Sequence, residues 1–229
     1  MLPKVETPKF ETVVPSTGKK VEYRPFLVKE EKILMLASES DEYKDMIRAC
    51  QQIITNCTDG EVLGDDMTIF DMQDLFIRIR SASIGETQEF QLVCGECEKQ
   101  TAYELELKEL TAKGLDNLPD KEIKVGDEFV VVMKYPNAED VIEGFEADDV
   151  ELISTCIDAV VTQDETLSID DITKEEVVEF IENLPLDVMD KMREFIQAMP
   201  VVEHIIDYTC HHCDTEQKVS INGYEHFFG

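Results

Sequence analysis

Alternation of apolar and polar residues opens the chain, and helical spacing replaces it after residue 28. Residues 10–14 and 20–23 alternate on either side of a turn that contains Gly18, which predicts a β-hairpin. Apolar residues spaced three and four apart then predict three helices. These helices cover residues 29–37, 41–57 and 68–82. We therefore expect an extended arm with a hairpin over residues 1–27 and a helical segment over residues 28–85.

Two later segments share one alternating pattern, and each is interrupted by a pair of cysteines. The predicted strands are 87–92 and 102–107 around the first pair, and 204–208 and 218–221 around the second. Aligning the cysteines superimposes Phe90 on Ile206, Leu92 on Tyr208, and Leu105 on Ile221. The two segments are thus expected to be two copies of one hairpin, separated by a long stretch of sequence.

The residues between these hairpins are predicted to form an acidic, mostly helical insertion over 110–202. An alternating stretch at 122–134 predicts one hairpin, and apolar spacing predicts a helix over 149–162. Thr173 and Glu176 have the spacing of a capping box, which marks the start of a helix. Pro185 is expected to begin a last helix, which runs to about Met199.

The two cysteine pairs predict a structural zinc site. Both pairs have the form Cys-x-x-Cys, and the four residues are Cys94, Cys97, Cys210 and Cys213. Two thiolates on a tight turn can bind one side of a tetrahedral metal, and two such turns complete the four-sulfur shell of structural zinc. That shell leaves no open position for water, so no metal catalysis is expected. His204, His211 and His212 lie near the second pair as alternative ligands, but four cysteines already fill the shell.

Three other interpretations of these cysteines are open. A redox pair is expected at the start of a helix, whereas the residues after Cys97 and Cys213 alternate. Disulfides are disfavoured because the chain has an odd number of cysteines, seven, and shows no signal peptide, which suggests a reducing compartment. Unrelated buried thiols are the third interpretation. The remaining cysteines, Cys50, Cys57 and Cys156, fall on apolar helical stripes and are expected in the core.

The sequence therefore predicts an α+β fold, mainly helical, with a two-knuckle, four-cysteine zinc ribbon. Two β-hairpins that are distant in sequence form this ribbon, over residues 86–109 and 203–224.

Charge excludes some classes of partner. The chain has 51 acidic and 21 basic residues and a net charge of −30, so nucleic acid and anionic membranes would repel it. Residues 1–29 carry six basic and three acidic residues, whereas residues 137–184 carry sixteen acidic residues and only Lys174. The two regions can attract each other or bind partners of opposite charge, or they can be solvated surfaces. No apolar run is long enough for a membrane span.

No catalytic constellation is evident, and we expect no enzyme activity. The segment 16–19 (Ser-Thr-Gly-Lys) resembles a phosphate-binding loop, but Val13 and Lys20 stand where that loop needs glycine and a hydroxyl residue. Paired carboxylates occur, but none has a nucleophile or base beside it in the sequence.

The N-terminal region resembles a family of proteins from T-even-like contractile-tailed phages. The similarity is carried by segment 14–20 (Val-Pro-Ser-Thr-Gly-Lys-Lys) and segment 23–32 (Tyr-Arg-Pro-Phe-Leu-Val-Lys-Glu-Glu-Lys), and the chain length and cysteine pairs agree with it. This family comprises baseplate hub subunits and baseplate hub assembly chaperones. The resemblance implies a non-enzymatic role in the host cytoplasm during assembly, or in the virion, with hub and tail proteins as partners. We also expect the acidic insertion to bind a basic hub or tail protein, and the 1–27 arm to pack on a neighbouring copy or partner.

Two other functional classes remain as alternatives. A regulatory zinc-ribbon adaptor that binds a host or phage protein has the same sequence features. An oxidoreductase acting through Cys94 and Cys97, or through Cys210 and Cys213, is the third class.

Overall fold

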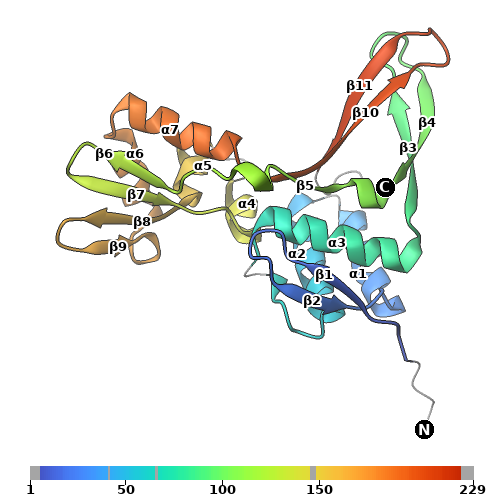
Figure 1. The fold of residues 1–229 in the computed structure, drawn as a ribbon, viewed down its shortest axis with the longest axis horizontal. Helices are drawn as coiled ribbons and strands as arrows, with labels where there is room; N and C mark the ends of the chain where they lie inside the picture. The colour runs from blue at the N-terminus through green and yellow to red at the C-terminus, as the bar shows by residue number, and fades with distance from the viewer. Residues whose placement is uncertain (1–5, 41, 65–66, 145–147, 223–229) are drawn as a thin grey trace. The chain divides into compact units, whose positions relative to one another are not determined.

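The chain forms two compact units in a computed structural model, which describes residues 6–40, 42–64, 67–144 and 148–222. Residues 1–113 and 201–229 form the first, which we call the discontinuous unit because two separate stretches of chain build it. Residues 114–200 form the second, the inserted unit. Figure 1 shows the elements of each.

In its described residues, the discontinuous unit contains three α-helices and three small antiparallel sheets, β1–β2, β3–β4 and β11–β10–β5. Its elements are β1 (Phe10–Val13), β2 (Lys20–Tyr23), α1 (Val28–Ser40), α2 (Tyr43–Cys57), α3 (Ile69–Ile84), β3 (Thr87–Val93), β4 (Gln100–Glu106), β5 (Thr111–Lys113), β10 (Val201–Thr209) and β11 (Glu216–Asn222). The three helices and three hairpins predicted for this part of the sequence are confirmed.

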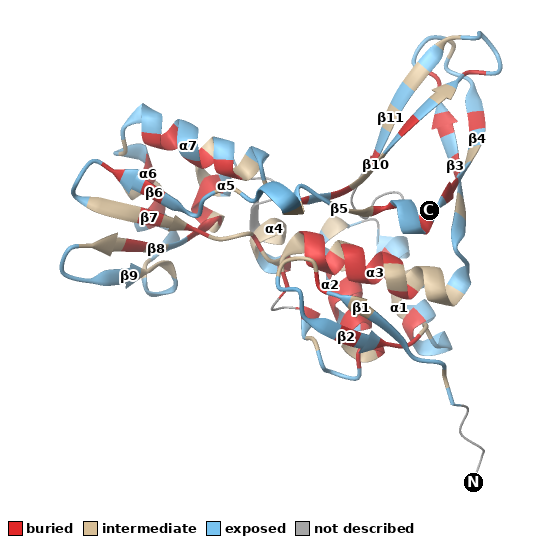
Figure 2. Cartoon of the chain, in the orientation of Figure 1, coloured by how far each residue is buried: buried red, intermediate tan, exposed pale blue. Residues whose placement is uncertain are grey.

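Helices α2 and α3 are the two elements with the most buried side chains in the described part of this unit (Figure 2). The apolar stripe that predicted α2 faces inward, and both of its cysteines, Cys50 and Cys57, are buried. Burial raises the pKa of the Cys50 thiol and raises that of Cys57 to about 12, so both thiols stay protonated. Their predicted place in the core is confirmed.

The N-terminal hairpin packs on these helices and forms part of their core. Val21 and Tyr23 are buried, and the guanidinium of the buried Arg24 pairs with Glu30 at 3.1 Å. At the hairpin turn, the backbone N–H and the hydroxyl of Ser16 donate to the two carboxylate oxygens of Asp71 at 2.8 and 2.5 Å. The sequence predicts an extended arm and hairpin over residues 1–27; the hairpin is present, and the buried side chains of this part of the segment pack within their own unit.

A short strand, β5, joins the second cysteine hairpin to the rest of the unit. It pairs with β10 in antiparallel register, with Lys113 opposite Val201. Since Lys113 precedes the inserted unit and Val201 follows it, the inserted unit begins and ends at paired positions of one sheet. No pattern of apolar and polar residues indicates this three-residue strand.

The inserted unit is a four-stranded antiparallel sheet of order β6–β7–β8–β9, packed with helices. Its elements are β6 (Glu122–Val125), β7 (Phe129–Met133), α4 (Ala138–Gly144), α5 (Asp149–Thr155), β8 (Ile157–Thr162), β9 (Thr166–Ser168), α6 (Lys174–Glu182) and α7 (Leu186–Gln197). It has its own core, which includes Val131 and Ile157 from the sheet and Ile181, Met192 and Phe195 from the helices. The insertion was predicted to be mostly helical, and its described residues also contain these four strands.

The helix predicted over 149–162 is wrong in its second half. Helix α5 ends at Thr155, and the chain then pairs with β7 as β8. Cys156 is fully buried between the two elements, so its predicted place in the core is confirmed. The capping box at the start of α6 is also confirmed, because the side chains of Thr173 and Glu176 bond to each other's backbone N–H.

Candidate metal centre

The first cysteine pair lies in the turn between β3 and β4. The backbone N–H of Cys94 donates to the carbonyl of Lys99 at 3.0 Å, and the N–H of Glu98 donates to the carbonyl of Cys94 at 2.9 Å. Glu98 has a φ of 57°, which bends the chain back into β4. This tight turn presents the thiols of Cys94 and Cys97 on the same side of the chain.

The second pair has the same backbone geometry between β10 and β11. The N–H of Cys210 donates to the carbonyl of Thr215, and the N–H of Asp214 donates to the carbonyl of Cys210, both at 2.9 Å. Asp214 also has a φ of 57°. The two turns are therefore structural equivalents, as the alignment of their cysteines predicted.

The four sulfur atoms come together where the tips of the two hairpins meet (Figure 1). The Sγ atoms of Cys94 and Cys213 are 3.7 Å apart, as are those of Cys97 and Cys210, and all four lie within 4.8 Å of one another. Zinc–sulfur bonds of about 2.3 Å place neighbouring sulfurs of a tetrahedron about 3.8 Å apart. Disulfide sulfurs are about 2.05 Å apart. The separations therefore fit a shared tetrahedral ion and exclude disulfides in this arrangement.

Hydrogen bonds between the hairpins hold the two turns against each other. The N–H of Gly95 donates to Oε1 of Gln217 at 3.2 Å, and the ring Nε2 of His212 lies 3.3 Å from the carbonyl of Gln100. The alternation of the strands gave no signal for these partners.

The local dipoles favour thiolates at the second pair. The pKa of Cys210 is lowered to about 6, chiefly because the N–H of His212 points at its sulfur from 3.5 Å. Hydrogen bonding to Thr215 lowers the pKa of Cys213. The backbone at Lys99 acts to lower the pKa of Cys97, but burial and the adjacent sulfurs outweigh it and raise that pKa to about 12. Neighbouring thiolates repel one another, so the four sulfurs do not all become charged on their own. A bound cation would relieve this repulsion.

None of the described histidines joins this sulfur cluster. The ring of His204 faces Glu109, with Nε2 at 3.4 Å from Oε2, and His212 is turned toward Gln100. The four cysteines predicted from the spacing are therefore the residues that the fold brings together. No helix follows either pair, since β4 and β11 come next, so the helix start expected of a redox pair is missing.

One signal in the sequence marks the second half of each turn. An acidic residue, Glu98 or Asp214, comes directly after the last cysteine of each pair and adopts the positive φ. Aspartate and asparagine are the residues that most often take this conformation besides glycine. The alignment of the two segments contains this match.

These features define the class of protein. It is a small α+β scaffold in which two non-identical cysteine knuckles, distant in sequence, can share one metal ion and so stabilise the fold. A family model described as T4 bacteriophage base plate protein matches residues 7–229, and the chain belongs to this family. No curated protein and no solved structure matches the chain. None of the helices in the described part of the chain is long and apolar enough to cross a membrane.

Proposed function

We propose that this base plate family member is a hub subunit or a hub assembly chaperone that acts through protein–protein contacts and contains a structural zinc. The observation that carries this proposal is the convergence of four sulfurs from two hairpins within 4.8 Å, in a chain whose family belongs to the phage base plate. No open coordination position would remain after four thiolates bind, so the metal would stabilise the scaffold and not catalyse a reaction.

The zinc would be held by Cys94, Cys97, Cys210 and Cys213. Binding to such a site contributes on the order of 10 kcal/mol of apparent folding free energy. The tips are only partly shielded from water, since Cys97 is half-buried and Cys213 is exposed. The ion would therefore be the main attraction that keeps the hairpin tips together.

An exposed apolar surface on α1 supports a role in protein contacts. Val28, Met35 and Leu36 are 68, 58 and 68 % exposed, although the opposite side of the same helix is packed against α2. Met35 and Leu36 lie seven and eight residues after Val28, so the three side chains share one face of the helix, and an exposed apolar face is often a protein contact. We interpret this surface as one of the contacts that assembly uses.

Metal analysis tests the proposed site. The purified chain is expected to contain one zinc per chain, and four of its seven thiols are expected to react with a thiol reagent only after a chelator is added. Cys94→Ser combined with Cys213→Ser should abolish zinc binding, whereas Cys156→Ala, which leaves the four sulfurs intact, should retain it. A metal-free chain with fast-reacting thiols would favour the oxidoreductase instead.

Affinity purification from infected cells tests the proposed role. The tagged chain is expected to copurify with tail hub proteins, identified by mass spectrometry. A variant with Met35→Lys and Leu36→Lys should lose part of that set, and Glu31→Lys on the same helix should lose none of it. Recovery of transcription machinery instead of tail proteins would favour the regulatory adaptor.

A further inference from the structure

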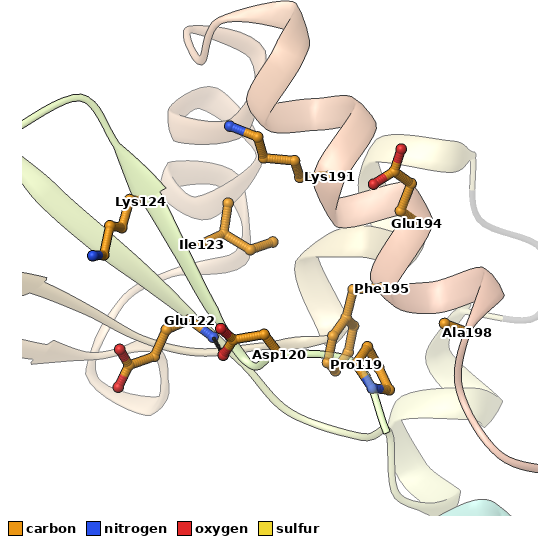
Figure 3. A pocket seen from close by; sticks show the side chains of 9 residues that line it. All are labelled: Pro119, Asp120, Glu122, Ile123, Lys124, Lys191, Glu194, Phe195 and Ala198. Carbon is orange, nitrogen blue, oxygen red and sulfur yellow. Dashed lines mark hydrogen bonds between the residues drawn. The ribbon is translucent and has the colours of Figure 1, made fainter. Parts of the chain in front are cut away.

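A groove of about 540 Å³ lies between β6 and α7 in the inserted unit (Figure 3). One face of α7 forms its wall through residues spaced three, four and seven apart, which are Lys191, Glu194, Phe195 and Ala198. The opposite side is β6 itself, with Pro119 and Asp120 leading into it. The groove therefore follows the length of a strand.

The side of β6 away from β7 is a free sheet edge, because β6 is the end strand. The N–H of Met133 donates to the carbonyl of Lys121 at 2.7 Å, which identifies that pair as hydrogen-bonded. In an antiparallel ladder such pairs alternate, so the backbone N–H and C=O of Glu122 and Lys124 point away from β7. Asp120 accepts the N–H of Glu122 at 3.0 Å. Within the described residues, the N–H of Lys124 and the carbonyls of Glu122 and Lys124 have no partner, so they remain for a further strand.

The groove offers an apolar floor and acidic sides. Ile123 and Phe195 are only 5 and 2 % exposed and lie at its base. Glu122 and Glu194 are exposed, and within the described residues neither carboxylate has a cationic partner. Two lysines lie beside the groove. Lys191 pairs with Asp187 at 3.3 Å, whereas Lys124 has no ionic partner within the described residues.

The charge of the whole unit indicates the sign of the partner. Residues 114–200 contain 24 acidic and 6 basic residues, so a basic segment is attracted to this unit and an acidic one repelled. An extended segment that adds to a sheet edge gains main-chain hydrogen bonds, and its alternate side chains enter pockets on one face. Both requirements are present at β6.

We propose that the free edge of β6 binds a basic, extended segment of a partner protein as an added strand. The segment pairs with the backbone of Glu122 and Lys124, places alternate apolar side chains over Phe195 and Ala198, and directs its cationic side chains to Glu122 and Glu194. This inference rests on the proposed function only in taking the partner to be a protein, and it does not depend on the metal.

A synthetic peptide in which lysine alternates with valine is the probe, and the zinc-loaded full chain is the target. Affinity is measured by fluorescence anisotropy, and hydrogen exchange of the Lys124 amide is followed by NMR. We expect binding at micromolar to millimolar peptide, with slower exchange of the Lys124 amide. The same peptide with N-methyl groups on alternate backbone nitrogens should bind about tenfold more weakly, since it lacks the donors of an added strand. Replacing its lysines with glutamate should abolish binding.

Two pairs of variants locate the site. Lys124→Pro removes the outward N–H without disturbing the bonds to β7 and should weaken binding about tenfold. Thr166→Pro is the matched control on the other end strand, because the N–H of Thr166 also points away from its neighbour. A second pair tests the acidic sides of the groove. The double variant Glu122→Lys and Glu194→Lys should weaken binding at low salt. The control, Glu179→Lys with Glu182→Lys on α6, changes the net charge by the same amount and should weaken binding less.

Several outcomes would overturn the proposal. Among them are no binding by the unmodified chain at millimolar peptide, equal affinity for the N-methylated peptide, and equal effects of Lys124→Pro and Thr166→Pro. The comparison between the two peptides uses the unmodified chain, so it decides the question even where a proline variant does not fold. A positive peptide result alongside a failed copurification with tail proteins would leave the strand site in place and remove the assembly role.

Discussion

Glu30 is the most deeply buried charge in the described part of the discontinuous unit. Its side chain is fully enclosed, and its carboxylate accepts hydrogen bonds from the guanidinium of Arg24 and from the N–H of Leu27 at 2.8 Å. The same guanidinium donates to the carbonyl of Asn56 at the end of α2, at 2.9 Å. Burial acts to raise the pKa of the Glu30 carboxyl, but the hydrogen bonds from Arg24 and Leu27 hold it below its usual value. The pair thus connects the N-terminal hairpin, α1 and α2.

Glu30→Gln is expected to destabilise the discontinuous unit by about 3 kcal/mol, because it leaves the Arg24 charge buried without a partner. Since the folded-state pKa of Glu30 is lowered, the stability from its charge is complete above the unfolded pKa of about 4.5 and is lost as the pH falls through the folded pKa. Urea unfolding from pH 7 to pH 3 should therefore show the gap between the two proteins closing at the acid end. Glu31→Gln, at the exposed next position, is the control, and a gap of constant size would contradict the assignment.

The N-terminal hairpin is an integral part of the helical core, although its proline-containing sequence indicated an arm. Val14, Val21 and Tyr23 are buried, and the N–H of Phe26 donates to the hydroxyl of Ser83 on α3 at 2.8 Å. The hairpin therefore covers apolar surface of α2 and α3 that water would otherwise reach.

Deletion of residues 1–27 is expected to unfold the discontinuous unit, since it removes the three buried side chains of Val14, Val21 and Tyr23 and the partner of Glu30. Deletion of residues 1–8 removes no described side chain that is buried and should leave the thermal transition within a few degrees of the full chain. Circular dichroism melting distinguishes the two. A stable, cooperatively folded protein without residues 1–27 would restore the detachable arm.

The elements that the sequence predicted are those whose signals are local. The capping box at Thr173 and the stripe of α2 depend on neighbours within one or two turns, and both are present. The boundary between helix α5 and strand β8 was not predicted, because Ile153, Cys156 and Val160 keep helical spacing across it. What ends the helix is pairing of β8 with β7, a tertiary interaction that outweighs local spacing. The β-branched run at the end of that stretch was the available evidence for a strand.

For the candidate metal site, spacing alone predicted which four cysteines would meet. Each pair is a local turn, and four thiols in two equivalent turns leave few other arrangements. The contacts of Gln217 and His212 could not be predicted, because they depend on how one hairpin is rotated against the other.

Along the chain, the sequence of the inserted unit interrupts that of the discontinuous unit. Lys113 and Val201, the last and first residues of the discontinuous unit at the junction, are cross-strand partners, and paired Cα atoms in antiparallel strands are about 5 Å apart. A two-residue turn can bridge such a pair. The core cluster of the inserted unit is built from its own residues.

Replacing residues 114–200 with Asn-Gly is therefore expected to give a folded protein that still binds one zinc. Zinc content and a cooperative melting transition are the measurements, and Cys94→Ser in the same shortened chain is the control that should lose the metal. Loss of zinc in the shortened chain itself would show that the inserted unit contributes to the centre.

Removal of zinc by a chelator should affect the two units unequally. The discontinuous unit is expected to lose several kcal/mol of stability, because the hairpin tips no longer share an ion. The inserted unit has its own core and should keep its slow amide exchange. Hydrogen exchange with and without chelator measures both, and equal loss of protection in both units would contradict their independence.

The separation of the cysteine pairs has a consequence for biosynthesis. Cys210 lies 113 positions after Cys97, so a ribosome releases the first knuckle long before its counterpart has been made. During that interval the early thiols are exposed to oxidants and to competing metals, while the intervening polypeptide has time to collapse into its own sheet. Closure of the centre therefore has to wait until the inserted unit and the second knuckle have been synthesised.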